Sequence, residues 1–292
     1  MTTDAGNYVV AYEATQQGND AVELAVALAR LTGDALRICL VLTLPTSIPA
    51  KVPANTGDFE SLLESQALAW LAEAQSRVPD DVIASTHLLW AESTSEGLIR
   101  AAEEFRSDRI VVGASRRGLL GRFTIGSVAN ALLHASHVPV ALAPRGYTAP
   151  ERITRITCAI GTRPGWQALL DSVAALSAGL VVDLRFVTLV EVDAGHGHHA
   201  IESSGDHLVQ VLDYFTARST AQGQTQTSVA HGAGVEAAVD GLDWRPDELA
   251  FVGSSRLAQP SRIFLGVTAS RMLHSLPVPL VVVPTQASST QS

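Results

Sequence analysis

The sequence predicts an α/β fold made of two tandem copies of one module, each a five-stranded, mostly parallel sheet with helices on both faces. The first observation is that short, continuously apolar strands alternate with helices, which is typical of a parallel sheet covered on both faces. The second is an internal repeat at a fixed spacing. The 292 residues, 47% hydrophobic and 17% charged, supply enough apolar surface for two ordinary domains.

The repeat is clearest in the later part of each copy. Arg109-Ile-Val-Val-Gly-Ala-Ser-Arg116 returns as Leu249-Ala-Phe-Val-Gly-Ser-Ser-Arg256, so that Gly113 and Gly253 lie 140 positions apart. Five more pairs share this offset: Arg122 with Arg262, Gly126 with Gly266, His134 with His274, Pro139 with Pro279 and Pro144 with Pro284. Six matches within one loop, helix and strand indicate a duplication.

The beginnings of the two copies also match, at a longer offset. Tyr8-Val-Val-Ala-Tyr-Glu13 resembles Ile156-Thr-Cys-Ala-Ile-Gly161, 148 positions on. The difference between 148 and 140 places eight extra residues in the first copy, and we expect the proline- and glycine-containing stretch 45–57 to hold them as a loop. A similar stretch, 145–151, marks the boundary, which divides the chain into domains 1–147 and 148–292.

Each copy alternates strands and helices. In the first copy, apolar runs predict strands and apolar residues at helical spacing predict helices. The strands are expected at 8–12, 36–42, 82–90, 109–112 and 140–143, and the helices at 20–31, 60–77, 95–105 and 127–137. In the second copy, the apolar stretch 172–190 contains Asp183 and Arg185, which indicates a helix followed by a strand rather than a membrane span. Ligands of such sheets bind at the carboxyl ends of the strands.

Composition excludes several classes of function. The formal net charge of −9 lacks the basic footprint of a nucleic-acid-binding protein and the polybasic segments that hold a protein on an anionic membrane. Lys51 is the only lysine, which excludes a P-loop lysine and Schiff-base chemistry. The first residues show no signal-peptide pattern, so we expect a cytoplasmic protein. Cys39 and Cys158 lie in apolar strands and are expected to be buried thiols rather than a disulfide.

The candidate binding loop follows the strand at 109–112. It runs from Gly113 to Gly126 and Ser127, where a helix begins. Free N–H groups and the positive dipole end at a helix N-terminus attract phosphate, and glycines let the backbone approach phosphate oxygens. Ser127 adds a hydroxyl donor, while Arg116 and two further arginines add positive charge. Spacing alone favours a simpler alternative, in which the glycines only shape the turn between strand and helix.

Most specifically across 113–144, the sequence resembles the universal stress protein family, and the resemblance covers nearly the whole chain as two tandem domains. It implies a Rossmann-like, adenine nucleotide α-hydrolase-like fold. It also implies a regulatory protein that binds ATP, with Mg, in its first domain; an enzyme is not expected, with weak ATPase activity left open. Nucleotide-binding members have Gly, two residues, Gly, nine residues, Gly, then Ser or Thr. Gly113, Gly126 and Ser127 match, and Arg116 occupies the position of the second glycine.

The resemblance implies two further contacts with the adenosine part of a nucleotide. The family's first strand usually ends in an aspartate, and Glu13 occupies that position. A backbone site matching Val41 would contact the adenine. Arg116 either blocks the phosphates or replaces an amide contact with a cation. The alternative function is therefore an interaction scaffold of the same fold that works without nucleotide.

The second copy lacks most of this site. Gly161 stands in place of the carboxylate, Arg256 in place of the second glycine, and Val267 in place of the hydroxyl. We therefore expect the second domain to be a degenerate partner of the first.

No catalytic residue and no metal site is expected. Gly195-His-Gly-His-His199 resembles a metal-binding cluster, but the segment itself contains no carboxylate or cysteine to complete a site, and a mobile loop is the favoured interpretation. His134 and His274 lie near helix C-termini, where capping is favoured over catalysis. The last strands, 140–143 and 280–283, are apolar edges that must be covered. We expect them to pair within the chain as a pseudo-dimer, while a homodimer of two chains stays open.

Overall fold

A computed structural model describes residues 6–43, 56–114, 125–162, 165–192, 197–254 and 266–284, without the side chains of 56–60 and 197–200. The first half of the chain contains β1 (Asn7–Ala11), α1 (Gln16–Thr32), β2 (Ala35–Thr43), α2 (Thr56–Ser76), β3 (Ala84–Ala91), α3 (Thr94–Glu104), β4 (Arg109–Gly113), α4 (Ser127–Ala135) and β5 (Val140–Ala143). The second half contains β6 (Arg155–Ala159), α5 (Trp166–Leu176), β7 (Asp183–Glu191), α6 (Gly197–Thr216), β8 (Thr225–Gly232), α7 (Val235–Asp240), β9 (Glu248–Gly253), α8 (Val267–Ser275) and β10 (Leu280–Val283).

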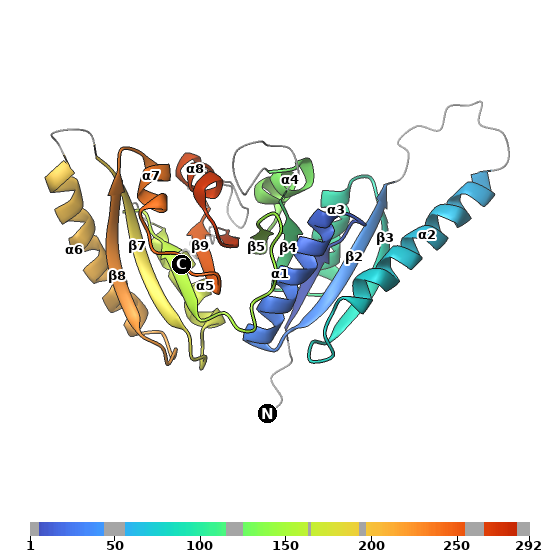
Figure 1. The fold of residues 1–292 in the computed structure, drawn as a ribbon, viewed down its shortest axis with the longest axis horizontal. Helices are drawn as coiled ribbons and strands as arrows, with labels where there is room; N and C mark the ends of the chain where they lie inside the picture. Colours follow the sequence, from blue (N-terminus) through green and yellow to red (C-terminus); the bar gives the residue numbers. More distant parts are fainter. Residues whose placement is uncertain are drawn as a thin grey trace, which may run out of the picture.

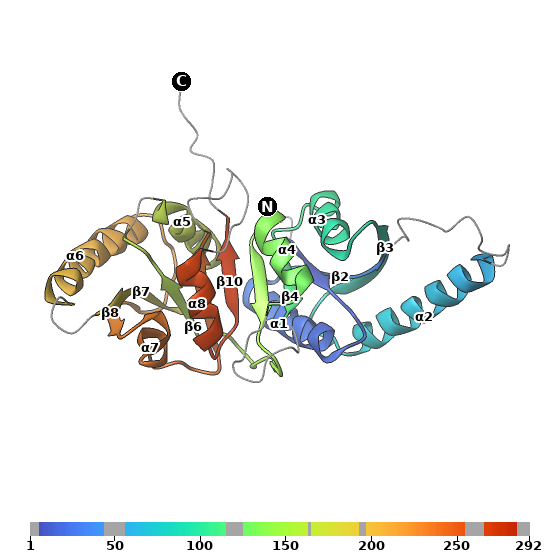
Figure 2. The same cartoon turned by 90° about the horizontal axis from the view of Figure 1, so that it is seen from above.

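All these strands form one sheet of ten strands in the order β3-β2-β1-β4-β5-β10-β9-β6-β7-β8. Within each half every neighbouring pair is parallel. The halves join through the antiparallel pair β5 and β10, in which Leu142 lies opposite Leu280, and they spread to either side of this junction (Figures 1 and 2). The expected pairing of the last strands is confirmed. Each half contributes five strands, as predicted, and backbone hydrogen bonding across the junction joins the two sets into one sheet.

The helices form a layer on each face of the sheet. One apolar core lies under α1, α2, α5 and α6 and runs through both halves. The other lies mainly under α3, α4, α7 and α8. Cys39 and Cys158 are free, buried thiols, as predicted. The strands are apolar on both sides because both faces are covered.

Some predicted boundaries shift. Helix α1 begins at Gln16 rather than residue 20, because the side chain of Thr15 accepts a hydrogen bond from the Gly18 N–H and caps the helix. Gly18 in the first turn weakened the helical pattern there. The predicted loop at 195–199 lies partly outside the described residues, and its last three positions belong to α6 instead.

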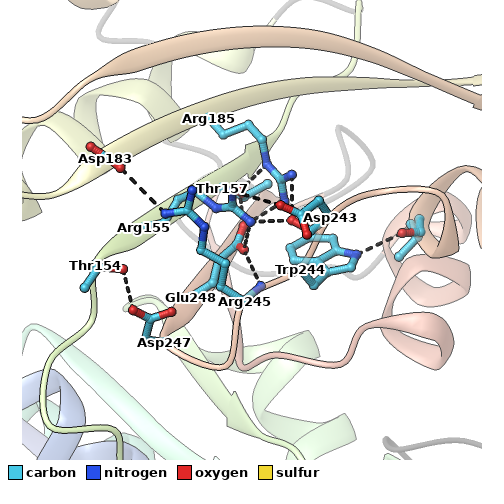
Figure 3. Close-up of polar contacts among 11 residues, drawn as sticks. Thr154, Arg155, Thr157, Asp183, Arg185, Asp243, Trp244, Arg245, Asp247 and Glu248 are labelled. Carbon is cyan, nitrogen blue, oxygen red and sulfur yellow. Dashed lines mark hydrogen bonds and ion pairs between the residues drawn. The ribbon is translucent and has the colours of Figure 1, made fainter.

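A buried ion cluster holds the amino ends of β6, β7 and β9 together (Figure 3). The Glu248 carboxylate, 1% exposed, accepts hydrogen bonds from the guanidinium groups of Arg155 (2.5 Å) and Arg185 (2.8 Å) and from the Thr157 hydroxyl. The Arg185 guanidinium also lies over the Trp244 ring, 5.0 Å from its centre. Burial lowers the pKa of Arg185. The cluster therefore lies at the amino ends of the strands, whereas ligands of such sheets bind at the carboxyl ends.

Candidate functional site

The first half has a cavity of about 170 Å³ at the carboxyl ends of its central strands. The ends of β1 and β4, a residue of β2, and the first turns of α1, α3 and α4 form its wall. The lining residues are Ala11, Tyr12, Glu13, Gln17, Gly18, Cys39, Thr94, Val112, Gly113, Gly126, Ser127, Val128 and Ala129. The cavity lies at the edge where ligands of open α/β sheets bind.

The structure brings four of the six predicted site residues together. Glu13, Gly113, Gly126 and Ser127 all line the cavity. Val41 is not among the described lining residues; its side chain packs towards α3, where a Cβ added to Gly97 would lie 2.8 Å from it. Arg116 lies outside the described residues.

Four further residues line the cavity without having been predicted from the sequence: Gln17, Gly18, Cys39 and Thr94. A local signal existed for Thr94, because Ser93 and the glutamate three residues later form a capping pattern that places a helix start at this edge. Cys39 resembled any other residue of a buried strand. Gln17 and Gly18 were missed because the start of α1 was placed too late.

The three helix N-termini at the cavity differ in their caps. Helix α1 is capped by Thr15, and α3 by Ser93, whose hydroxyl accepts from the Glu96 N–H at 3.2 Å. Helix α4 has Gly126 at its N-cap and no side-chain hydrogen bond there. The first N–H groups of a helix have no partner within the helix. Ser127 and the next residues of α4 therefore present backbone donors and a positive dipole end to the cavity.

Close packing explains two of the glycines without any ligand. A Cβ on Gly113 would lie 2.1 Å from the Gln17 carbonyl oxygen, and one on Gly18 would lie 2.0 Å from the Glu13 carbonyl oxygen. Both distances are far below van der Waals contact. A side chain at either position would push the first turn of α1 out of place. Gly113 is thus required by the fold, and it cannot by itself indicate a phosphate site.

Charge in the cavity comes from Glu13 among the described lining residues. Burial raises the pKa of the Cys39 thiol to about 12 and also raises the pKa of the Tyr12 hydroxyl, so both groups are neutral at pH 7. The Cys39 thiol donates to the Arg37 carbonyl at 3.4 Å. The described wall therefore offers one carboxylate, neutral polar groups and the N-terminus of α4.

In the second half, glycine or valine replaces each of four polar side chains of the cavity. The equivalent pairs follow from the repeat offsets and matching helix caps: Glu13 with Gly161, Gln17 with Gly165, Thr94 with Val235 and Ser127 with Val267. None of these replacements has a side-chain hydrogen-bonding group. These four positions therefore offer no polar side chain to a ligand at this edge of the second half.

Ion pairs tie the second half together at the same edge. Arg271 of α8 pairs with Glu236 of α7 at 2.7 Å and with Glu191 at the end of β7. The Arg271 guanidinium lies 2.7 Å from the position that a Cβ on Gly234 would take. Ala131, which cannot form an ion pair, occupies the corresponding position in the first half. The two halves therefore differ in chemistry where their folds are most alike.

Within the described ranges, no three histidine, cysteine, aspartate or glutamate side chains lie close enough to share a metal ion. His134 lies in the last turn of α4, where its Nδ1 is 2.7 Å from the Asn130 carbonyl oxygen. Among the helices that the structure describes, none has the length and apolar character needed to cross a membrane.

Comparison with known proteins gives the family. Residues 6–144 match the universal stress protein family. Universal stress proteins of Mycobacterium tuberculosis and Mycobacterium bovis are 29% identical over 291 residues, which span 94% of this chain and 99% of theirs. A solved universal stress protein from Archaeoglobus fulgidus has the same fold, with a TM-score of 0.67 at 15% identity over 97% of this chain and 99% of that one. Residues 6–144 form a universal stress protein domain, and the second half of the chain repeats the fold of this domain.

Proposed function

We propose that this chain is a regulatory universal stress protein that binds an adenine nucleotide, ATP with Mg, in its first domain (1–147) and none in its second (148–292). The nucleotide changes which surfaces the protein offers to partners, and no chemical step is required of the site. Family membership supports the regulatory role.

The observation that carries this proposal is the difference between the two strand-end edges. The first half keeps Glu13, Thr94 and Ser127 beside the uncapped N-terminus of α4. A carboxylate can accept hydrogen bonds from ribose hydroxyls, and the α4 N-terminus can donate to a phosphate. The cavity of about 170 Å³ is smaller than the roughly 300–1,000 Å³ of typical ligand pockets, so a nucleotide would extend beyond the described wall.

A thermal-shift titration with Mg-ATP tests the proposal. We expect saturable stabilisation of the native chain and about tenfold weaker binding for Ser127→Val, the residue that the second half carries. Val267→Thr at the equivalent second-half position is the matched control, and it should leave the titration unchanged. Absence of binding at millimolar Mg-ATP would contradict the proposal.

The second candidate is a nucleotide-independent interaction scaffold. Arg116 favours it, because a long side chain stands where nucleotide-binding members have bare backbone. This function predicts that Arg116→Gly binds ATP while the native chain does not. Equal affinity of the two proteins for ATP would contradict it.

A further inference from the structure

Helix α2 is packed against the protein along only part of its length. Ala67, Leu71 and Ala74 are buried on the sheet, whereas all residues from 61 to 66 are exposed. In both views the helix extends outward past the end of the sheet, with its N-terminal end farthest from the body (Figures 1 and 2). Short helices without tertiary contacts are marginally stable in water. The outer part of α2 therefore lacks the packing that normally holds a helix.

The outer part of α2 is nevertheless apolar. Leu62, Leu63 and Trp70 are 67%, 38% and 37% exposed, and at 3.6 residues per turn they fall within roughly a 100° arc. This arc lies beside the buried stripe. We call these three residues the α2 face. Of the eight large exposed hydrophobic residues in the described chain, these three lie together on one side of the helix, while a fourth, Leu68, lies on the other side of the buried stripe. Such clustering marks an interaction surface, whereas single exposed apolar residues do not.

Among the described side chains of the corresponding helix, α6, Val209 is the only large exposed hydrophobic residue. Helix α6 buries Ser204, Leu208, Val211 and Phe215, spaced along most of its length. Trp166 of α5 reaches towards it and packs edge-on against the Tyr214 ring, 5.1 Å between ring centres. The first half has Gly18 where the second has Trp166. The α2 face is therefore a property of one half only.

The charge of α2 selects the occupant. Its 21 residues contain Asp58, Glu60, Glu64 and Glu73 and no lysine or arginine. Arg77, directly after the helix, is already paired with Glu73 at 2.9 Å. A second copy of this chain would bring the same carboxylates against it, and like charges at close range are unfavourable. A partner segment with an apolar stripe flanked by lysines and arginines would match both the apolar α2 face and the negative charge of the helix.

We propose that α2 is a docking helix for a cationic, amphipathic helix of another protein. The partner's apolar stripe packs on the α2 face, in the manner of an amphipathic helix against an apolar surface, and its basic residues meet the α2 carboxylates. The docking helix does not depend on nucleotide binding, because its residues are separate from the cavity.

The test uses a synthetic, end-blocked helical peptide of leucine and lysine with the leucines on one face. A twin peptide carries glutamate in place of every lysine. Binding of fluorescently labelled peptide to the whole chain is followed by anisotropy at low and high salt. We expect the lysine peptide to bind more tightly than its twin by at least about tenfold, and salt to weaken its binding.

Two variants of the chain complete the test. Leu62→Gln combined with Leu63→Gln should weaken lysine-peptide binding by about tenfold. The matched control, Val181→Gln with Val209→Gln, changes two second-half valines that are each 59% exposed, and it should bind within about twofold of the native chain. Equal losses in both variants, or equal binding of both peptides, would overturn the proposal. Self-association of the native chain that the Leu62 and Leu63 changes abolish would also overturn it, since a second copy would then occupy the face.

Discussion

The two halves of this chain share one fold and differ at both edges of their sheets. At the carboxyl ends of the strands, the first half has a cavity with polar side chains, and the second has glycine, valine and ion pairs around Arg271. At the amino ends, the second half has the buried ion cluster around Glu248. Asp108 occupies the matching position in the first half and is exposed.

The two halves share an apolar core and differ in the polar residues at the edges of the sheet. Apolar strands and helix faces must stay complementary for either half to fold, so they change little. A polar site residue is free to change once its ligand is no longer bound there. The second half has glycine or valine in place of the polar side chains that line the first-half cavity, and its Arg271 forms internal ion pairs at this edge.

The largest effect is expected from Glu248→Gln. This change leaves two buried guanidinium groups with only the exposed Asp243 carboxylate, 3.9 Å from Arg155, as a countercharge. Breaking a buried ion pair in this way costs about 3–5 kcal/mol. Urea denaturation measures the loss of unfolding free energy. Asp108→Asn, at the equivalent exposed position, is the control. Similar losses in the two variants would show that burial of the Glu248 cluster does not matter.

The next largest effect is a difference in stability between alanine substitutions at two equivalent glycines, Gly113 and Gly253. Gly113→Ala places a methyl group against the Gln17 carbonyl oxygen and should destabilise the chain by about 1–3 kcal/mol. Gly253→Ala should be nearly neutral, because the nearest atom to its Cβ is Leu169 Cβ at 3.9 Å, an ordinary contact. Denaturation midpoints of the two variants give the comparison. A larger loss for Gly253→Ala would contradict the packing described for α1.

A third prediction concerns ligand affinity. Glu13→Gly gives the first half the residue found in the second, and we expect nucleotide affinity to fall by about tenfold, or about 1.4 kcal/mol. Gly161→Glu should add no second site, because the other polar replacements remain. Isothermal titration calorimetry measures both affinity and stoichiometry. If Glu13→Gly bound nucleotide as tightly as the native chain, the Glu13 carboxylate would not be part of the site.

The smallest effect is expected from Asp108→Asn, and it depends on pH. Partial burial and the nearby Asp34 carboxylate raise the pKa of Asp108 above its ordinary value of 3.8. The charged form of Asp108 is therefore less favourable in the folded chain than in the unfolded chain. This lowers the free energy of unfolding at pH values above the pKa of Asp108 in the folded chain. It has no effect at pH values below the pKa of Asp108 in the unfolded chain. Asp108→Asn should stabilise the chain at pH 7 by less than about 0.5 kcal/mol, because the group is exposed to solvent. Thermal melts should show that the stabilisation by Asp108→Asn disappears as the pH falls below 3.8, the ordinary pKa of aspartate. A stabilisation that grows at low pH would contradict the raised pKa of Asp108.

The sequence predicted the fold because the fold depends on apolar periodicity and on the internal repeat. Both are visible in the sequence, the repeat for example in the matching positions of Gly113 and Gly253. The sequence predicted Gly126 and Ser127 because they begin a helix after a strand, and it predicted Glu13 through the resemblance to the universal stress protein family. It did not predict Thr94 or Gln17, which reach the cavity only through the packing of α3 and α1. The joining of the two halves was predicted because strands 140–143 and 280–283 are apolar edges that must be covered.

The number of nucleotides that one chain binds tests the asymmetry between the two halves most directly. Native mass spectrometry of freshly purified protein with added Mg-ATP counts them. We predict one nucleotide per native chain and none in Glu13→Gly combined with Ser127→Val. Two nucleotides per chain, or one that survives this double change, would contradict the asymmetry between the halves.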